Sequence, residues 1–490
     1  MPHLSKSLPN SIRELKKQVI QSLSLGDINY ALRLIHDRVE SIITEPICTA
    51  HVFSSKELDF LCQQIGSQNL LSLKTDLHTT NASRVGQAPP PKIAYLLSRW
   101  QKTGGHSRLV IDFINSQPNK EHIIYITGIG GPSNLDYLKK NLSTNTRTKI
   151  LTAPHGNYQK RLSWLQNELK NCGADHIYLF NHHQDSVIVS ALVPELGIPG
   201  TFCHHGDHHL CLGVHLAHLS HIDFHPMGYH YCREKLKVDN FYLPLTFEDK
   251  GIVGHSVKSL TSSGLRTATA AGTNKIEIPY HVSYLDIVPK ILKITGGTHL
   301  HIGRLTPWAL HYLRRQLRQH QVPENKLIYI PWTPSVWKSL QEHDIDVYLA
   351  SFPYGAGLTL IEAMGAGIPV IMHQHMYSRV LSGLEIAYPE AFSWADPDVL
   401  LKHISKLKRE KLIQEGQIAR LHYKNFHRPE MLRGFLADSN KATITAPPLN
   451  KEFQPQYDEW AAWQEAQLTF LKLIHRFLHR AIRKIRRTIT

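Results

Sequence analysis

Two series of short apolar runs, each alternating with amphipathic segments, constrain the fold of this chain more than any other feature. The first series comprises residues 92–98, 122–129, 148–154, 176–181 and 199–205, with helical periodicity between the runs, as at 158–172. The second comprises 265–272, 298–304, 326–332, 346–352 and 368–374, with helical segments at 307–320 and 358–367. Strand–helix alternation of this length predicts parallel sheets covered by helices on both faces. The fold class is therefore α/β, with two Rossmann-like doubly wound domains facing across a cleft.

Two breaks in composition divide the chain. The Pro-rich stretch "GQAPPPK" (86–92) precedes the first series, and the Ser/Thr/Gly-rich stretch "SLTSSGLRTATAAGTNK" (259–275) introduces the second. Such stretches are typical of loops and linkers. We expect a helical N-terminal region at 1–88 and Rossmann-like domains at 89–250 and 251–435. Helices at 436–490 would complete the chain.

The cysteine content and the apolar runs indicate the compartment. Six cysteines are scattered over 490 residues without a CxxC pair, which favours a reducing cytoplasm over a disulfide framework. The N-terminus lacks the continuous apolar core of a signal peptide, and no run approaches the ~20 apolar residues that span a bilayer.

The net charge of +15 is concentrated in part at the C-terminus, in "LKLIHRFLHRAIRKIRRTIT" (471–490). At helical spacing its apolar residues fall on one side and its basic residues on the other: Leu471, Ile474, Leu478, Ile482 and Ile485 against Lys472, Arg476, Arg480, Arg483 and Arg487. Such a helix suits an anionic membrane surface. The alternatives are a tail that packs on the protein or touches nucleic acid, but a nucleic-acid tail has no need of the apolar stripe. We expect no nucleic-acid partner and a peripheral position on the inner face of the plasma membrane.

The segment "DVYLASFPYGAGLTLIEAMGAGIPVIMHQ" (346–374) has the layout of a nucleotide site. Gly355 and Gly357 follow a buried strand and allow the backbone to approach a ligand. Thr359 opens a helix whose free N–H groups and positive dipole end suit a phosphate. Glu362, about one turn later, can reach the hydroxyls of a ribose. The alternative is a strand–loop–helix in which the glycines serve packing alone.

This segment resembles the donor-binding motif of GT-B glycosyltransferases, a glycine-rich loop followed by "EAM-x-x-G-x-PV". Many members place a first glutamate where this chain has Tyr354, so one acid of their pair is missing. The run "DVYLASFPYGAG", followed by "SRV" at 378–380, is similar to the O-GlcNAc-transferase-like enzymes. The resemblance implies donor binding by a set of neighbouring residues: Tyr354, Gly355, Gly357, Leu358, Thr359 and Glu362.

The histidine-rich run "TFCHHGDHHLCLG" (201–213) allows two interpretations. The spacing Cys203-x-His205-x-Asp207-His208 is close to the ligand run of metallo-β-lactamase-like zinc hydrolases, with Cys in place of their first His. The segments "HHQDSVIVSAL", "HHGDHHLCLG" and "HIDFHPMGYHYCRE" together resemble O-GlcNAc-transferase-like sequences over some fifty residues. We favour the second interpretation and expect no metal. Asp207 would then orient a neighbouring imidazole, and His208 is a candidate base.

Further site candidates follow the first strand of each domain. In "QKTGGHSRLVIDFI" (101–114), Gly104 and Gly105 resemble a "GGHTR" loop that faces the donor in many GT-B enzymes. His106 is the leading candidate for a general base or a phosphate contact, although it could merely cap the helix. Lys275 would neutralise the diphosphate leaving group, as the family implies.

The remaining donor-side candidates are Arg304, beside the phosphates, and Trp332, which could stack on the nucleotide base. The implied activity is sugar transfer from a nucleotide-diphosphate sugar, with UDP expected as the nucleotide, in a metal-independent reaction without a cofactor. The acceptor would be a carbohydrate, a lipid-linked molecule or a protein. No 34-residue repeat is present, so synthesis of a bacterial surface polysaccharide or glycoconjugate is favoured over protein glycosylation. A UDP-sugar epimerase, a zinc-dependent hydrolase and a non-catalytic nucleotide-binding protein remain alternatives.

Overall fold

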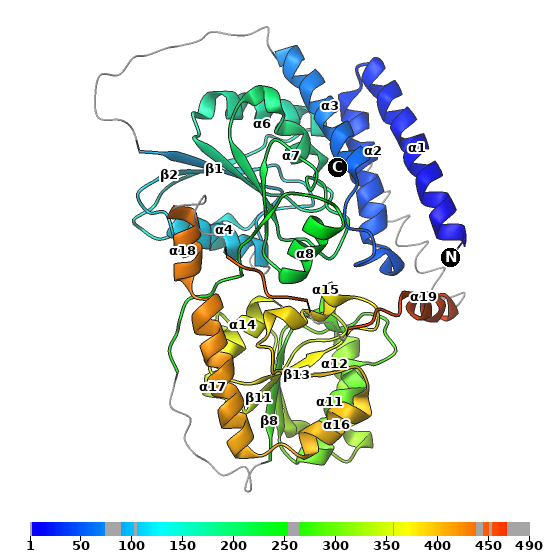
Figure 1. Ribbon diagram of the computed structural model, residues 1–490, viewed down its shortest axis with the longest axis vertical. Helices are drawn as coiled ribbons and strands as arrows, with labels where there is room; N and C mark the ends of the chain where they lie inside the picture. Colours follow the sequence, from blue (N-terminus) through cyan, green and yellow to red (C-terminus); the bar gives the residue numbers. More distant parts are fainter. Residues whose placement is uncertain are drawn as a thin grey trace.

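A computed structural model describes residues 2–73, 90–101, 105–252, 264–355, 357–437, 444–449 and 453–467. It contains two α/β domains, one above the other in Figure 1, each built on a parallel sheet. The predicted fold class is confirmed.

The first sheet has seven strands in the order β3-β2-β1-β4-β5-β6-β7, and all pairs are parallel. The strand order reverses between β1 and β4. In doubly wound sheets, ligands bind in the crevice at such a reversal. The strands are β1 Lys92–Leu97, β2 Glu121–Ile126, β3 Arg147–Thr152, β4 His176–Phe180, β5 Gly200–His204, β6 Ser220–Asp223 and β7 Phe241–Tyr242.

The second sheet repeats this arrangement in six parallel strands, in the order β10-β9-β8-β11-β12-β13, with its own reversal between β8 and β11. The strands are β8 Arg266–Ala270, β9 Thr298–Ile302, β10 Leu327–Ile330, β11 Val347–Leu349, β12 Val370–His373 and β13 Phe392–Trp394. Every strand predicted from the apolar runs is present. The short strands β6, β7 and β13 were not predicted.

Helices cover both faces of each sheet (Figure 1). On the first sheet they are α4 Gly105–Asn115, α5 Leu135–Asn141, α6 Tyr158–Cys172, α7 Ser186–Ala191 and α8 Pro226–Glu234. On the second they are α10 Thr273–Ile276, α11 Tyr284–Thr295, α12 Pro307–Gln319, α13 Val336–Glu342, α14 Leu358–Gly365, α15 Arg379–Ser382, α16 Pro397–Ser405 and α17 Arg409–Phe426.

The N-terminal helices belong to the first domain. Helices α1 (Pro2–Ser24), α2 (Ile28–Ile43) and α3 (Lys56–Ser72) lie side by side in Figure 1. Helices α2 and α3 pack against α6 and α7, and α1 packs on α2 and α3. Ile35 and Ile65 from these helices share one buried cluster with Leu162, Val187 and Phe202 of the α/β layer. Amphipathic helices become stable by burying an apolar face, so the region predicted at 1–88 has its partner in the adjoining domain.

The chain returns to the first domain after the second sheet. Helix α18 (Pro429–Ala437) contacts α4, so the boundary predicted at 435 falls inside a helix that packs on the first domain. The backbone N–H of Phe247 donates to the carbonyl of His427 at 2.9 Å, and the ring of His427 donates to the carbonyl of Leu245 at 2.8 Å. One hydrophobic cluster runs through both domains.

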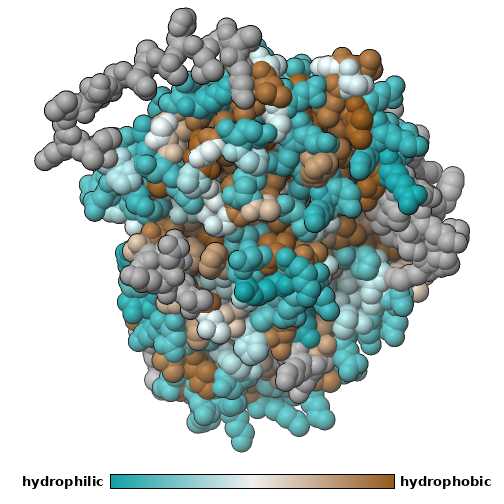
Figure 2. Space-filling model, turned by 45° about the horizontal axis from the view of Figure 1, so that its top comes forward, coloured by the Kyte–Doolittle hydropathy of each residue, from teal (hydrophilic) through white to brown (hydrophobic). Residues whose placement is uncertain are grey.

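Helix α19 (Tyr457–Ala466) ends the described part of the chain, and the predicted basic helix at 471–490 lies outside the described residues. Within the described ranges, none of the helices combines the length and the apolar character needed to traverse a bilayer. The face in Figure 2 is mostly hydrophilic, with hydrophobic side chains in separate groups.

Candidate functional site

The strands that flank the two order reversals carry the predicted site residues at their carboxyl ends. Gly105 and His106 begin the helix after β1, and Lys275 lies in the short helix after β8. The segment 354–359 follows β11 and leads into α14. Ligands of doubly wound sheets bind beyond these strand ends, so both domains contribute to one region.

Gly357 brings the start of α14 against the first domain. It is the N-cap residue of this helix, and a Cβ at this position would lie 2.9 Å from Leu245 Cδ1 and 3.4 Å from His225 Nε2. A Cβ on Gly105, at the start of α4, would lie 3.7 Å from Leu358 Cδ1. The two predicted glycine loops therefore face each other across the domain boundary. Gly104 lies outside the described residues.

Lys275 is held against the loop before α14. Its Nζ donates to the Gly355 carbonyl at 2.5 Å, and its own carbonyl accepts the N–H of Tyr354 at 3.2 Å. Burial lowers the pKa of Lys275 to about 8, because removal from water disfavours the charged ammonium. The charge of Lys275 adds to the effect of burial in lowering the pKa of His208 and partly opposes the rise in the pKa of His225.

Gly355 has a packing role. Its N–H donates to the carbonyl of Leu381 at 2.7 Å, and a Cβ would lie 2.8 Å from the carbonyl oxygen of Ser382. The glycine thus allows the loop to approach α15. The neighbouring Tyr354 is half-buried, and its ring lies 6.1 Å from that of His375.

Thr359 and Glu362 point to different parts of the second domain. The Tyr348 hydroxyl donates to Thr359 Oγ1 at 3.0 Å, which directs the threonine hydroxyl toward the sheet. Glu362 is 6% exposed and accepts the backbone N–H of Trp337, in the first turn of α13, at 2.9 Å. Burial raises the pKa of Glu362.

Two predicted donor contacts lie on exposed loops of the second domain. Arg304, after β9, is exposed, and its carbonyl accepts the N–H of Thr273 at 3.1 Å, beside the helix that carries Lys275. Trp332 is 45% exposed in the loop between β10 and α13, whose first turn contacts Glu362. The ligand contacts of both residues stay predictions.

His106 belongs to a cluster of imidazoles. Its Nε2 donates to the Arg99 carbonyl at 3.2 Å, and its ring lies 4.6 Å from His182 and 5.3 Å from His205. Burial lowers the pKa of His106 to about 4 and that of His182 to about 2. Burial, together with neighbouring His209 and His183, also lowers the pKa of His208. These imidazoles are neutral near pH 7.

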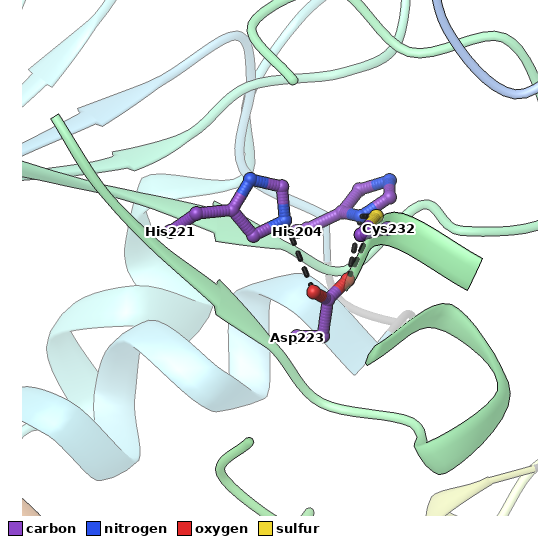
Figure 3. A group of neighbouring side chains, drawn as sticks. All are labelled: His204, His221, Asp223 and Cys232. Carbon is purple, nitrogen blue, oxygen red and sulfur yellow. Dashed lines mark hydrogen bonds and ion pairs between the residues drawn. The ribbon is translucent and has the colours of Figure 1, made fainter. Parts of the chain in front are cut away.

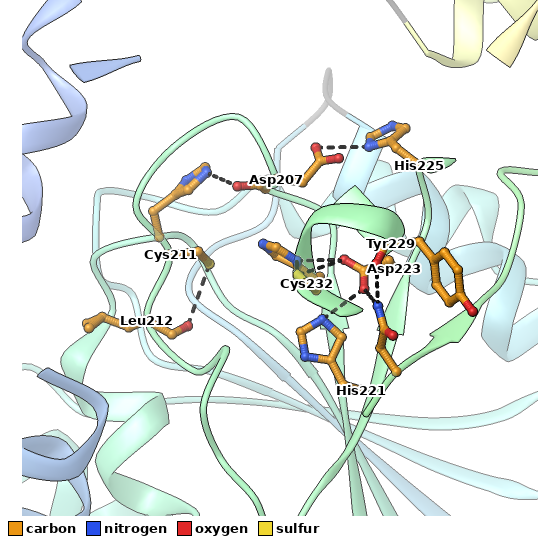
Figure 4. A network of polar contacts seen from close by, with 12 residues as sticks. Asp207, Cys211, Leu212, His221, Asp223, His225, Tyr229 and Cys232 are labelled. Atoms are coloured by element: carbon orange, nitrogen blue, oxygen red, sulfur yellow. Dashed lines mark hydrogen bonds and ion pairs between the residues drawn. The ribbon is translucent and has the colours of Figure 1, made fainter. Parts of the chain in front are cut away.

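His225 is the exception. Its Nδ1 lies 2.9 Å from Asp207 Oδ1 (Figure 4), and Asp207 is buried. Burial alone would lower the pKa of His225, but the carboxylate of Asp207 outweighs burial and raises it. Asp207 was predicted to orient an imidazole. The imidazole that it contacts is that of His225, which the sequence did not single out. His225 directly precedes α8, and Gly228 of that helix lets the Asp207 carboxylate approach, because a Cβ there would lie 2.6 Å from Asp207 Oδ2.

The residues of the proposed zinc-hydrolase run do not converge. Cys203 lies in the hydrophobic core, His205 donates to the Asn181 carbonyl at 3.1 Å, and Asp207 pairs with His225. Among the described residues, a different group comes within metal-ligating distance (Figure 3): His204, His221, Asp223 and Cys232.

Comparison with known proteins gave matches in structure alone. No family model matched the sequence, and the search of curated proteins found no match. The apo form of the lipopolysaccharide outer core galactosyltransferase WaaB superposes with a TM-score of 0.52 at 13% identity, over 71% of this chain and 99% of WaaB. Anabaena HepE in complex with UDP and glucose has a TM-score of 0.53 at 12% identity, over 71% of this chain and 99% of HepE.

The chain has the GT-B fold. A metallo-β-lactamase-like zinc hydrolase would have a β-sandwich. This chain instead has two parallel-sheet domains that meet at their strand ends. The alternative based on the run at 203–208 is therefore wrong in its fold.

Sequence reasoning missed three groups at the domain boundary: His225, Arg108 and Lys250. Burial raises the pKa of Glu362, and the cations Lys250 and Arg108 partly oppose this rise. Both cations lie over the ring of Phe247. Arg108 was within reach, because it stands in the quoted "GGHSR" segment two residues after His106. His225 offered less signal, since one imidazole among 33 has no distinguishing spacing.

We predict that Asp207→Asn destabilises the protein more at pH 6 than at pH 9. Because the carboxylate raises the pKa of His225, the pair stabilises the fold below the ordinary histidine pKa of about 6.5, and this contribution is lost as the pH rises through the raised value. Thermal unfolding at both pH values measures the difference. His225→Gln should remove the same pH-dependent part, and an equal loss at both pH values would contradict the coupling.

Proposed function

We propose that this protein is a glycosyltransferase that moves a sugar from a nucleotide-diphosphate donor, with UDP as the nucleotide, to an acceptor at the domain boundary. One observation supports this most: the start of α14, Lys275 and the Asp207–His225 pair converge there from separate elements. Two structural neighbours support this proposal, since WaaB is a galactosyltransferase and HepE was crystallised with UDP and glucose.

The donor diphosphate would bind at the start of α14. Free backbone N–H groups and the helix dipole stabilise negative charge there, and Lys275 supplies a cation. Gly357 has no Cβ to obstruct the approach. Glu362 would accept the ribose hydroxyls, Trp332 would contact the base, and Arg304 would lie beside the phosphates.

The second domain would stabilise the leaving group, which is the nucleoside diphosphate. Negative charge grows on the departing diphosphate as the glycosidic bond breaks, and preorganised donors aimed at that charge lower the barrier. The helix start and the ammonium of Lys275 meet this need without a catalytic metal ion.

We assign the acceptor side to His225. A general base works best with a pKa near the working pH. Burial holds the pKa of His106 at about 4, and that of His208 well below normal, so both are weak bases. The pKa of His225 is raised, and Asp207 binds its Nδ1–H, which leaves Nε2 toward Gly357 as the proton acceptor. His106 and His208 would then serve as neutral hydrogen-bonding groups.

The proposed acceptor is a carbohydrate or lipid-linked intermediate of a bacterial surface polysaccharide or glycoconjugate. The decisive assay incubates the protein with UDP-sugars and candidate acceptors and measures release of UDP. A glycosyltransferase should release UDP with transfer of the sugar only when both the UDP-sugar and the acceptor are present. Epimerised sugar without an acceptor would indicate the epimerase alternative, and donor binding without turnover would indicate a binding protein. Transfer to protein acceptors alone would indicate a protein glycosyltransferase.

Glu362→Gln should weaken UDP binding ~10-fold or more, because a hydrogen bond to a charged group contributes about 1.5–3 kcal/mol. Calorimetric titration with UDP measures the affinity. Glu415→Gln is the matched control, since Glu415 is equally buried (6% exposed) but pairs with Lys411 on α17. Equal UDP affinity in Glu362→Gln and the unmodified protein would remove the ribose role.

Lys275→Arg should extend activity to higher pH. The kcat/KM of the unmodified protein should fall above about pH 8, where Lys275 loses its proton, whereas an arginine stays charged. Lys326→Arg is the control, because Lys326 also donates to a backbone carbonyl, that of Gly296. An alkaline limb that Lys275→Arg leaves in place would contradict the leaving-group role.

The basic helix predicted at 471–490 would bring the enzyme to a lipid-linked acceptor on the cytoplasmic face of the membrane. Deleting 471–490 should abolish co-sedimentation with vesicles that contain phosphatidylglycerol, while UDP affinity is retained. Unaltered sedimentation would refute the membrane contact.

A further inference from the structure

Four buried side chains with metal-ligating atoms meet behind the Asp207–His225 pair. His204 ends β5, His221 and Asp223 lie on β6, and Cys232 lies on α8. All four are at most 3% exposed, and their candidate ligand atoms lie within 4.8 Å of one another (Figure 3). Residues two apart on a strand face the same side, so His221 and Asp223 point to the same space.

The distances between the four ligand atoms are close to those around an ion with tetrahedral coordination. Cys232 Sγ lies 3.6 Å from His204 Nδ1 and 3.6 Å from Asp223 Oδ1. Zinc–sulfur and zinc–nitrogen or –oxygen bond lengths imply roughly 3.6 Å between such ligands in a tetrahedron. The nitrogen–oxygen separations are shorter, 2.8 Å for His204–Asp223 and 3.2 Å for His221–Asp223, so small outward shifts would open the site.

Two buried ring nitrogens of the group have no hydrogen-bond partner among the described residues. His221 Nε2 makes no hydrogen bond although it lies 3.2 Å from Asp223 Oδ2, and His204 Nε2 also has none among the described residues. Buried polar atoms usually have partners. A metal ion at the centre would satisfy His221 Nε2 directly. Asn240 Nδ2 donates to Asp223 Oδ2 at 2.6 Å, the kind of outer contact that orients a ligating carboxylate.

We propose that His204, His221, Asp223 and Cys232 form a structural zinc site. Thiolate, imidazole and carboxylate are zinc ligands, and a closed four-ligand set is typical of structural zinc. A divalent cation would balance the two negative charges of the thiolate and the carboxylate.

The ion would fasten β5, β6 and α8 to one another. The loop after β5 carries Asp207, three residues after His204, and the loop between β6 and α8 carries His225, two residues after Asp223. The zinc site would therefore position the pair without touching the donor. Its positioning role rests on the proposed function of His225, whereas metal binding by the four residues can be measured without transferase activity.

The test uses full-length protein with a tag that contains no histidine, purified without chelators. Mass spectrometry of the metal content should find about one zinc per chain. Replacement by cobalt(II) should give a thiolate-to-cobalt charge-transfer band, which scattered surface histidines cannot produce. Cys232→Ser should lose the band and the zinc. Cys211→Ser is the matched control, because Cys211 is also buried and free but lies outside the group.

Unmodified protein that neither contains zinc nor gives the cobalt band after metal exchange would overturn the proposal, whether or not the variants fold. Equal bands in Cys232→Ser and Cys211→Ser would overturn it as well. UDP release in the transferase assay is a separate readout, so an inactive protein with the band would contradict the transferase function alone.

Discussion

The proposed site depends on one close approach, that of the start of α14 to the first domain. A Cβ at Gly357 would lie 2.9 Å from Leu245 Cδ1 and 3.4 Å from His225 Nε2, so the helix start lies next to an imidazole of the opposite domain. Parallel sheets explain why this meeting occurs at a functional place. Both sheets reverse their strand order once, and the elements that follow the reversals are those that face each other.

Burial organises the charges around this contact. Most of the imidazoles near it are neutral because desolvation lowers their pKa values, as at His106, His182 and His208. Asp207 makes His225 different, and Lys275 contributes the adjacent cation, whose pKa burial lowers to about 8. The pKa values of neighbouring imidazoles are thus shifted in opposite directions, which is typical of sites of acid–base chemistry.

The fold could be predicted from the sequence because buried parallel strands are continuous apolar runs. Strand β6 was not predicted because it carries His221 and Asp223 in place of apolar residues, β7 because it has only two residues, and β13 because Ser393 interrupts its apolar residues. The glycine loops were predicted from local sequence, and the structure explains Gly355 by packing and Gly357 by the domain contact. The pairing of Asp207 with His225, and the meeting of His204 with Cys232, join residues 18 and 28 positions apart through sheet register and helix placement. Such contacts cannot be predicted from the spacing of residues in the sequence.

The most direct test of the account is a crystal structure of the protein with UDP. We expect the diphosphate at the first turn of α14, within hydrogen-bonding distance of Lys275 Nζ and facing His225. UDP bound at another place, with the start of α14 free of phosphate, would contradict it.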